Sequence, residues 1–248
     1  MRPIFITGIG TDVGKTVVAA VVTEALGAAY WKPVQAGFDQ GTDTEWVAAR
    51  LSHPWARVVP KEAYKLKLPA SPHIAARQEN VVIHLGEIRR QFLEIRANLP
   101  LLPGQRNPDL EGVPGWSPPG PGDYFVIEGA GGLMVPLNES EFVIDLIKML
   151  NAQVIIVSRN YLGSINHSLL TAAVCKAHGL DVAGWIFNGE PSGYENEIAN
   201  WSGATWDLSI PWTDDPDKGF IREQAQRLQI GLMVMLERLE RLKRLEKP

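Results

Sequence analysis

The chain has 248 residues, of which 45% are hydrophobic and 21% charged, so a disordered or fibrous protein is excluded. A formal net charge of -4 disfavours nucleic acid or an anionic membrane as a partner. The single cysteine, Cys175, excludes an intrachain disulfide and a multi-cysteine metal site. No apolar stretch approaches the ~18 residues of a membrane span, and no signal peptide pattern is present, so a cytoplasmic location is expected.

Short apolar segments alternate with helical patterns along the chain. The expected strands cover residues 3–7, 29–31, 124–127, 153–157, 183–187 and, on a weaker pattern, 205–210. The expected helices cover residues 16–26, 44–51, 85–99, 142–150 and 166–178. The strands are apolar without alternation, which is typical of a sheet that helices cover on both faces. The order therefore predicts a doubly wound, mostly parallel α/β sheet.

Two segments depart from this alternation. Residues 99–123 contain seven prolines and five glycines, and a passive surface loop is favoured there over a functional lid. Residues 220–246 carry apolar side chains at helical spacing and then mixed acids and bases, which predicts a solvated amphipathic helix that could pack on a partner subunit. We expect residues 1–248 to form a single domain that includes both segments.

The strongest motif is GIGTDVGKT at residues 8–16, between the first expected strand and helix. Glycines let backbone N–H groups face phosphate oxygens, Lys15 would reach the β and γ phosphates, and Thr16 would bind Mg²⁺. The loop is one residue longer than the usual phosphate loop. The dinucleotide pattern G-x-G-x-x-G fails, because three residues separate Gly10 from Gly14. The motif predicts a binding site for ATP or a related nucleotide and a fold of the P-loop NTPase type.

Polar residues follow two other expected strands, where an open α/β sheet collects its ligands. Glu128 ends the strand at 124–127, and a carboxylate there is costly unless it is paired or metal-bound, so an Mg²⁺ ligand is favoured. Lys32 follows the strand at 29–31 and is either a solvated lysine or a second cation for phosphoryl transfer. On its own, Asp43 is favoured as a helix N-cap over a metal ligand. The five histidines show no metal-ligand spacing.

Taken in order, these motifs resemble the ATP-dependent dethiobiotin synthase family over nearly the whole chain. The matching segments are the extended phosphate loop, YWKPVQ at 30–35, DT at 43–44, LPASPH at 68–73, EGAGG at 128–132, LGSINH at 162–167, GWIFN at 184–188 and IPW at 210–212. Each match is modest, and their order is specific. The resemblance implies a homodimeric ligase that forms the ureido ring of dethiobiotin from 7,8-diaminopelargonate and CO₂ with ATP and Mg²⁺. One amine would take up CO₂ as a carbamate, which is phosphorylated and then attacked by the second amine.

The same resemblance assigns roles to residues by position. It implies Lys15, Lys32 and Asp12 as catalytic residues, Thr16, Asp43 and Glu128 as Mg²⁺ ligands, and Thr11, Asp12, Val13, Gly14, Lys15, Thr16, Glu128, Gly131, Asn188, Pro211 and Trp212 as the nucleotide site. It implies Lys32, Ala36, Gly163 and Asn166 as substrate-binding residues, the last two from a helix start across a dimer interface. The family usually has acids where Gly10 and Asp12 stand, the second often a glutamate, and often a serine where Ala36 stands.

The main alternative is a nucleotide-switched P-loop ATPase of the partition type, which acts by binding partners. Such proteins carry a signature lysine five residues before the loop lysine. Gly10 occupies that position here, which counts against this reading.

Overall fold

The computed structural model describes residues 1–54, 56–99, 123–204 and 207–245. Its strands are β1 Arg2–Gly8, β2 Ala29–Trp31, β3 Val34–Ala36, β4 Arg57–Val58, β5 Tyr64–Leu66, β6 Tyr124–Gly132, β7 Gln153–Ser158, β8 Val182–Asn188 and β9 Asp207–Ile210. Its helices are α1 Lys15–Leu26, α2 Asp43–Arg50, α3 Pro72–Gln78, α4 Leu85–Asn98, α5 Val143–Leu150, α6 Ser164–Ala177, α7 Glu195–Ser202 and α8 Lys218–Leu245.

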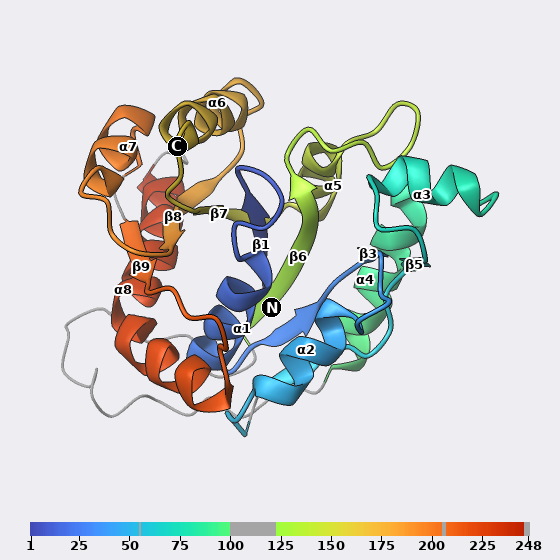
Figure 1. Cartoon of the computed structure of the whole chain (residues 1–248), viewed down its shortest axis with the longest axis horizontal. Coiled ribbons are helices and arrows are strands. Elements are labelled where there is room, and N and C mark those ends of the chain that lie inside the picture. The colour runs from blue at the N-terminus through green and yellow to red at the C-terminus, as the bar shows by residue number, and fades with distance from the viewer. Residues whose placement is uncertain (55, 100–122, 205–206, 246–248) are drawn as a thin grey trace.

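A seven-stranded sheet of order β4-β2-β6-β1-β7-β8-β9 forms the centre of the molecule, and all its neighbouring strands are parallel (Figure 1). Strands β3 and β5 form a second, parallel pair. This confirms the expected doubly wound, mostly parallel sheet. Strand β1 lies between β6 and β7, so the loop that follows β1 stands where the strand order reverses, the usual ligand crevice of such sheets.

Both faces of the sheet are buried, as the apolar strands predict. Along β1, Phe5 belongs to one core cluster while Ile4 and Ile6 belong to the other, because alternate side chains of a strand point to opposite faces. The cluster around Phe5 includes residues of α3 to α7. The cluster around Ile4 and Ile6 includes residues of α1, α2 and α8. The two helical layers hold the sheet rigid beneath its carboxyl edge.

Most expected elements are present with shifts of one or two residues at their ends, but β6 continues to Gly132, so Glu128 lies inside this strand and not after its end. The weak strand at 205–210 begins at Asp207, since residues 205–206 lie outside the described part of the chain. Most of the expected loop at 99–123 also lies outside it, at residues 100–122. Strands β3, β4 and β5 and helices α3 and α7 were not expected. They are short, and their sequences carry too little periodicity to separate them from loops.

Helix α8 packs against α1 of its own chain. Its buried side chains Leu228, Leu232 and Leu236 share a cluster with Val18 and Val22 of α1, so its apolar face packs inside its own chain. The buried side chains of α8 therefore serve the core of their own chain, whereas Ile230 and Val234 on the same helix are exposed. Within the described ranges, no helix is both long and apolar enough to cross a membrane.

Candidate active site

A cavity of about 1000 Å³ opens at the carboxyl edge of the sheet. Its walls come from the phosphate loop, β6, the start of α2, the segment around β3, the end of β8, and the residues that follow β7 and β9. The topology therefore brings together segments that lie far apart in the sequence, such as those of Thr11 and Trp212.

The phosphate loop is held in shape by backbone conformations that few residues adopt. Gly14 has φ +88°, and a Cβ on it would stand 1.8 Å from the amide nitrogen of Asn188. That same Asn188 Nδ2 donates to the carbonyl of Val13 at 3.2 Å, which ties the loop to the end of β8. Asp12 also has a positive φ, of 55°, although it is not glycine. Such conformations cluster at ligand sites, where the surrounding structure enforces them.

Lys15 begins α1 and folds back over the loop. Its Nζ donates to the carbonyl of Gly10 at 2.8 Å. Burial lowers the pKa of Lys15 to about 8, against the opposing attraction of Glu128. The side chain thus lines a site in which an added anion would favour its charged form.

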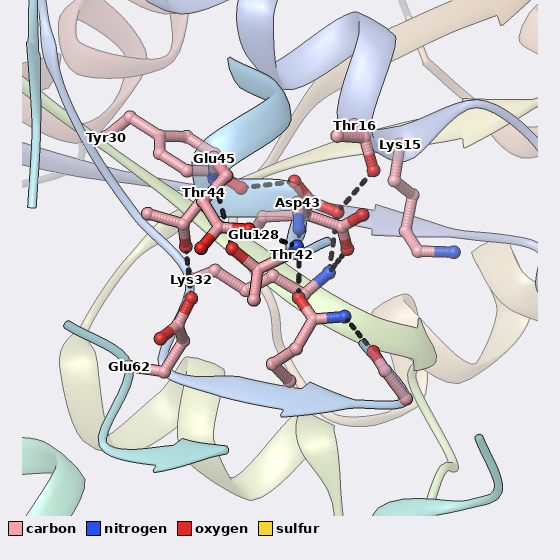
Figure 2. A network of polar contacts seen from close by, with 12 residues as sticks. Lys15, Thr16, Tyr30, Lys32, Thr42, Asp43, Thr44, Glu45, Glu62 and Glu128 are labelled. Carbon is pink, nitrogen blue, oxygen red and sulfur yellow. Dashed lines mark hydrogen bonds and ion pairs between the residues drawn. The ribbon is translucent and has the colours of Figure 1, made fainter. Parts of the chain in front are cut away.

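A buried ion network lines the cavity beside β2 and β6 (Figure 2). Glu128 is 1% exposed, and its Oε1 accepts from Lys32 Nζ at 2.8 Å and from Thr16 Oγ1 at 2.9 Å. Its Oε2 accepts from the hydroxyl of Tyr30 at 2.7 Å. Lys32 also forms an ion pair with Asp43. The structure thus brings Lys32, Thr16, Asp43 and Glu128 together in one network.

The two carboxylates control the charge of Lys32. Burial disfavours an ammonium ion, but the attraction of Glu128 and Asp43 outweighs burial and raises the pKa of Lys32 above its ordinary value. Lys32 is therefore a fixed cation in the cavity wall. Burial, followed by the charge of Glu128, raises the pKa of Tyr30 well above its ordinary value, so the Tyr30 hydroxyl remains a donor.

Asp43 is placed by the start of α2, and its expected role as the N-cap is wrong. The N-cap is Thr42, whose hydroxyl accepts from the backbone N–H of Glu45 at 3.1 Å, while the Glu45 carboxylate accepts from the N–H of Thr42 at 2.9 Å. Because Thr42 and Glu45 form this capping box, the side chain of Asp43 does not cap the helix. The backbone N–H of Asp43 donates to Gln35 Oε1 at 3.2 Å, which ties α2 to β3.

The oxygen donors in this network suit Mg²⁺. Thr16, Asp43 and Glu128 supply one hydroxyl and two carboxylates, and the described residues contain no group of three or more His, Cys, Asp or Glu that could hold a metal. Two carboxylates are few for a metal cage built by protein alone. They fit Mg²⁺, which proteins hold through one or two carboxylates together with the phosphates of a substrate.

The other end of the cavity lies beyond β8 and β9. Asn188 ends β8, and Pro211 and Trp212 follow β9. Arg159 follows β7, and its Cζ lies 3.8 Å from the centre of the Trp212 ring. Trp212 Nε1 donates to Asp214 Oδ1 at 3.1 Å. The sequence does not indicate Arg159 or Tyr30 as site residues, because the expected strand ends at residue 157, whereas Arg159 directly follows β7, which ends at Ser158.

Most of the predicted site residues line this one cavity. They are Thr11, Asp12, Gly14, Lys15, Thr16, Lys32, Ala36, Asp43, Glu128, Gly131, Asn188, Pro211 and Trp212. Val13 is buried and contributes its carbonyl behind the loop. Among the described residues, Gly163 and Asn166 do not line it either, and they lie at the start of α6.

Two solved structures share the fold of this chain. The MinD cell division protein of Aquifex aeolicus has a TM-score of 0.50 and 14% identity, with 97% of each chain covered. A putative plasmid partition protein of Borrelia burgdorferi has a TM-score of 0.50 and 12% identity, with 92% of this chain and 98% of that chain covered. Together with the glycine-rich loop, they show a fold of the P-loop NTPase type.

Sequence relatives narrow this class. A family model described as an AAA domain matches residues 2–219. ATP-dependent dethiobiotin synthetases of Cytophaga hutchinsonii and Christiangramia forsetii are each 44% identical, over 79% and 75% of this chain and 81% and 75% of theirs. That of Bradyrhizobium sp. is 40% identical over 84% of this chain and 87% of the relative. The chain belongs to the ATP-dependent dethiobiotin synthetase family.

Proposed function

We propose that this protein is an ATP-dependent dethiobiotin synthase, which closes the ureido ring of dethiobiotin from 7,8-diaminopelargonate, CO₂ and ATP. The observation that carries the proposal is the pair of lysines, Lys15 and Lys32, in one cavity with Asp43 and Glu128. A ring closure driven by phosphoryl transfer develops negative charge on phosphate oxygens, and fixed cations stabilise it. The match to several family segments in order supports the same activity.

The reaction divides between the substrate and the residues that hold it. One amine takes up CO₂ as a carbamate, whose oxygen displaces ADP from the γ-phosphate, and the second amine then closes the ring and releases phosphate. Lys32 is held by two carboxylates and Lys15 lies over the loop, which supports the proposal that the two cations would hold carbamate and phosphate against each other. Asp12 at the loop crest would face the diamine. Mg²⁺ bound at Thr16, Asp43 and Glu128 would withdraw charge from the phosphates.

Different lining residues of the cavity would bind the nucleotide and the diamine. Asn188, Pro211 and Trp212 would receive the base, and the amides of the loop, together with Gly131, would face the phosphates. Ala36 lies on the opposite side with the segment around Ser71, where the diamine would lie. The missing hydroxyl at Ala36 removes one polar contact to the carbamate.

A homodimer would complete the substrate site. Gly163, at φ +101°, caps the start of α6, and the positive end of a helix suits a carboxylate. Since Gly163 and Asn166 do not line the cavity of their own chain, they would serve the cavity of a partner. Leu162 is fully exposed beside them and Tyr161 is 41% exposed, which supports an interface at this corner.

The dimer is tested by the mass of the protein in solution. Leu162→Asp should halve the mass measured by light scattering, because it introduces a charge into the expected interface. Val82→Asp changes another exposed apolar residue, on the far segment after α3, and should leave the mass unchanged. A wild-type monomer would contradict the dimer.

The activity is tested by phosphate release with ATP, Mg²⁺, bicarbonate and the diamine. Release that depends on the diamine supports the ligase, and release that ignores the diamine contradicts it. The second result would favour a switched ATPase of the partition type. Space does not explain the absence of the signature lysine of those proteins, since a Cβ on Gly10 would meet nothing within 4 Å.

A further inference from the structure

Tyr30 contacts the ion network from the buried core and not from the cavity. Its side chain is completely buried, and it is absent from the described residues that line the cavity. Its hydroxyl nevertheless donates to Oε2 of Glu128 at 2.7 Å (Figure 2). Tyr30 therefore does not line the cavity, and its hydrogen bond to Glu128 is its contact with the ion network.

The register of the sheet explains how the hydroxyl arrives there. Tyr30 of β2 lies opposite Val126 of β6, and both belong to the core cluster on the α1 side. Because side chains alternate along a strand, Glu128 returns to that face two residues later. The tyrosine ring thus fills the apolar layer between the sheet and α1, and its length carries the hydroxyl to the carboxylate.

The hydrogen bonds divide the two oxygens of Glu128 between two sides. Oε1 faces Thr16 and Lys32, which line the cavity, whereas Oε2 is held back by Tyr30. A carboxylate otherwise rotates easily about its last bond, since such terminal torsions have broad minima. We propose that Tyr30 is a positioning residue that fixes this orientation, so that Glu128 presents a single oxygen to the metal and to Lys32. The proposal rests on the metal role given to Glu128 above.

The test measures how strongly Mg²⁺ improves nucleotide binding. Calorimetry gives the Kd of ATP with Mg²⁺ and with EDTA for wild type and for Tyr30→Phe, which keeps the ring and removes the hydroxyl. Loss of a hydrogen bond behind a metal ligand typically costs about tenfold or more in metal affinity, so the improvement by Mg²⁺ should shrink by about tenfold. The Kd in EDTA should not change.

Two controls separate positioning from a general loss of structure. Tyr124→Phe removes the hydroxyl of another buried tyrosine, at the amino end of β6, and should leave the response to Mg²⁺ unchanged. In a Glu128→Gln background, Tyr30→Phe should have no further effect on that response, because neighbouring residues that act through one another are not additive. A loss of thermal stability alone would not produce this pattern.

The outcomes separate the metal role of Glu128 from the positioning role of Tyr30. If wild-type binding does not respond to Mg²⁺, the metal role proposed for Glu128 is wrong. If wild type responds and Tyr30→Phe responds equally, that role stands and the role of Tyr30 is overturned. An equal loss in the single variant and in the Glu128→Gln background also overturns it, since the effect would not pass through Glu128.

Discussion

The two ends of the cavity differ in how firmly their side chains are held. Below β2 and β6, Lys32 and Glu128 are 5% and 1% exposed, and each has at least two hydrogen-bonded partners. Beyond β8 and β9, Trp212 is 40% exposed, and Arg159 stacks on its ring. One end is a closed polar network, and the other is an open surface.

This difference matches two kinds of chemical work. Charge that develops during phosphoryl transfer is best stabilised by groups that are already oriented, because they need not reorganise during the reaction. A nucleotide base carries no developing charge, so its site contributes mainly to affinity. We therefore expect changes near Lys32 to lower kcat and changes near Trp212 to raise the Kd of ATP by smaller factors.

The largest effect is expected from Lys32→Ala. It removes the cation between Asp43 and Glu128 and should lower kcat by at least about a hundredfold, the scale seen when one group that stabilises developing charge is lost. The Kd of ATP should change far less. Steady-state kinetics and calorimetry measure the two quantities. Lys65→Ala, at an exposed lysine outside the cavity, is the matched control. Unchanged kcat in Lys32→Ala would remove the distinction between the two ends.

Gly14→Ala should damage the contact that joins the two ends. Its φ of +88° disfavours alanine, and the new Cβ would collide with Asn188. We expect the free energy of unfolding to fall by about 1–3 kcal/mol and ATP binding to weaken. Gly10→Ala, in the same loop, meets nothing within 4 Å and should change neither. Chemical denaturation and calorimetry of both variants make the comparison, and equal stability of the two would contradict it.

The sequence predicts the long helices and strands and the motif residues, because these depend on local patterns. Uninterrupted apolar strands such as β7 and the context of the phosphate loop are local patterns that survive without tertiary information. Strand β4 spans only Arg57–Val58, too short to show any period. Helix α3 is also too short to show an apolar period, and the only local signal for it is Pro72 after Ser71, a common beginning for a helix.

Contacts inside the site follow a different rule. Lys32 and Glu128 could be placed at strand ends, but their contact depends on β2 lying beside β6, and strand order is not a local property. The hydrogen bond of Tyr30 depends in addition on register, which decides the face on which its ring lies. Arg159 reaches Trp212 because β7 and β9 flank β8. Motifs therefore indicate which residues belong to the site, whereas strand order and register determine which of them are in contact.

A smaller effect is expected from Asn188→Ala. The variant removes the hydrogen bond to the Val13 carbonyl and the amide that would face the base. A net hydrogen bond is worth about 0.5–1.5 kcal/mol, so the Kd of ATP should rise by up to about tenfold. At saturating ATP, kcat should stay near that of wild type, because the lysines and carboxylates are untouched. A fall in kcat comparable to that of Lys32→Ala would show that the base end also takes part in the chemistry.

The smallest effect is expected at Arg159, and a pair of variants identifies its cause. A cation over an exposed aromatic ring contributes about 0.5–1 kcal/mol, so Arg159→Ala should raise the Kd of ATP by about two- to fivefold. Arg159→Lys keeps the charge and loses the flat guanidinium that stacks on Trp212. If stacking orders the surface for the base, the Kd of Arg159→Lys should resemble that of Arg159→Ala. If charge alone attracts the phosphates, Arg159→Lys should resemble wild type, and added salt should weaken ATP binding to wild type more than to Arg159→Ala.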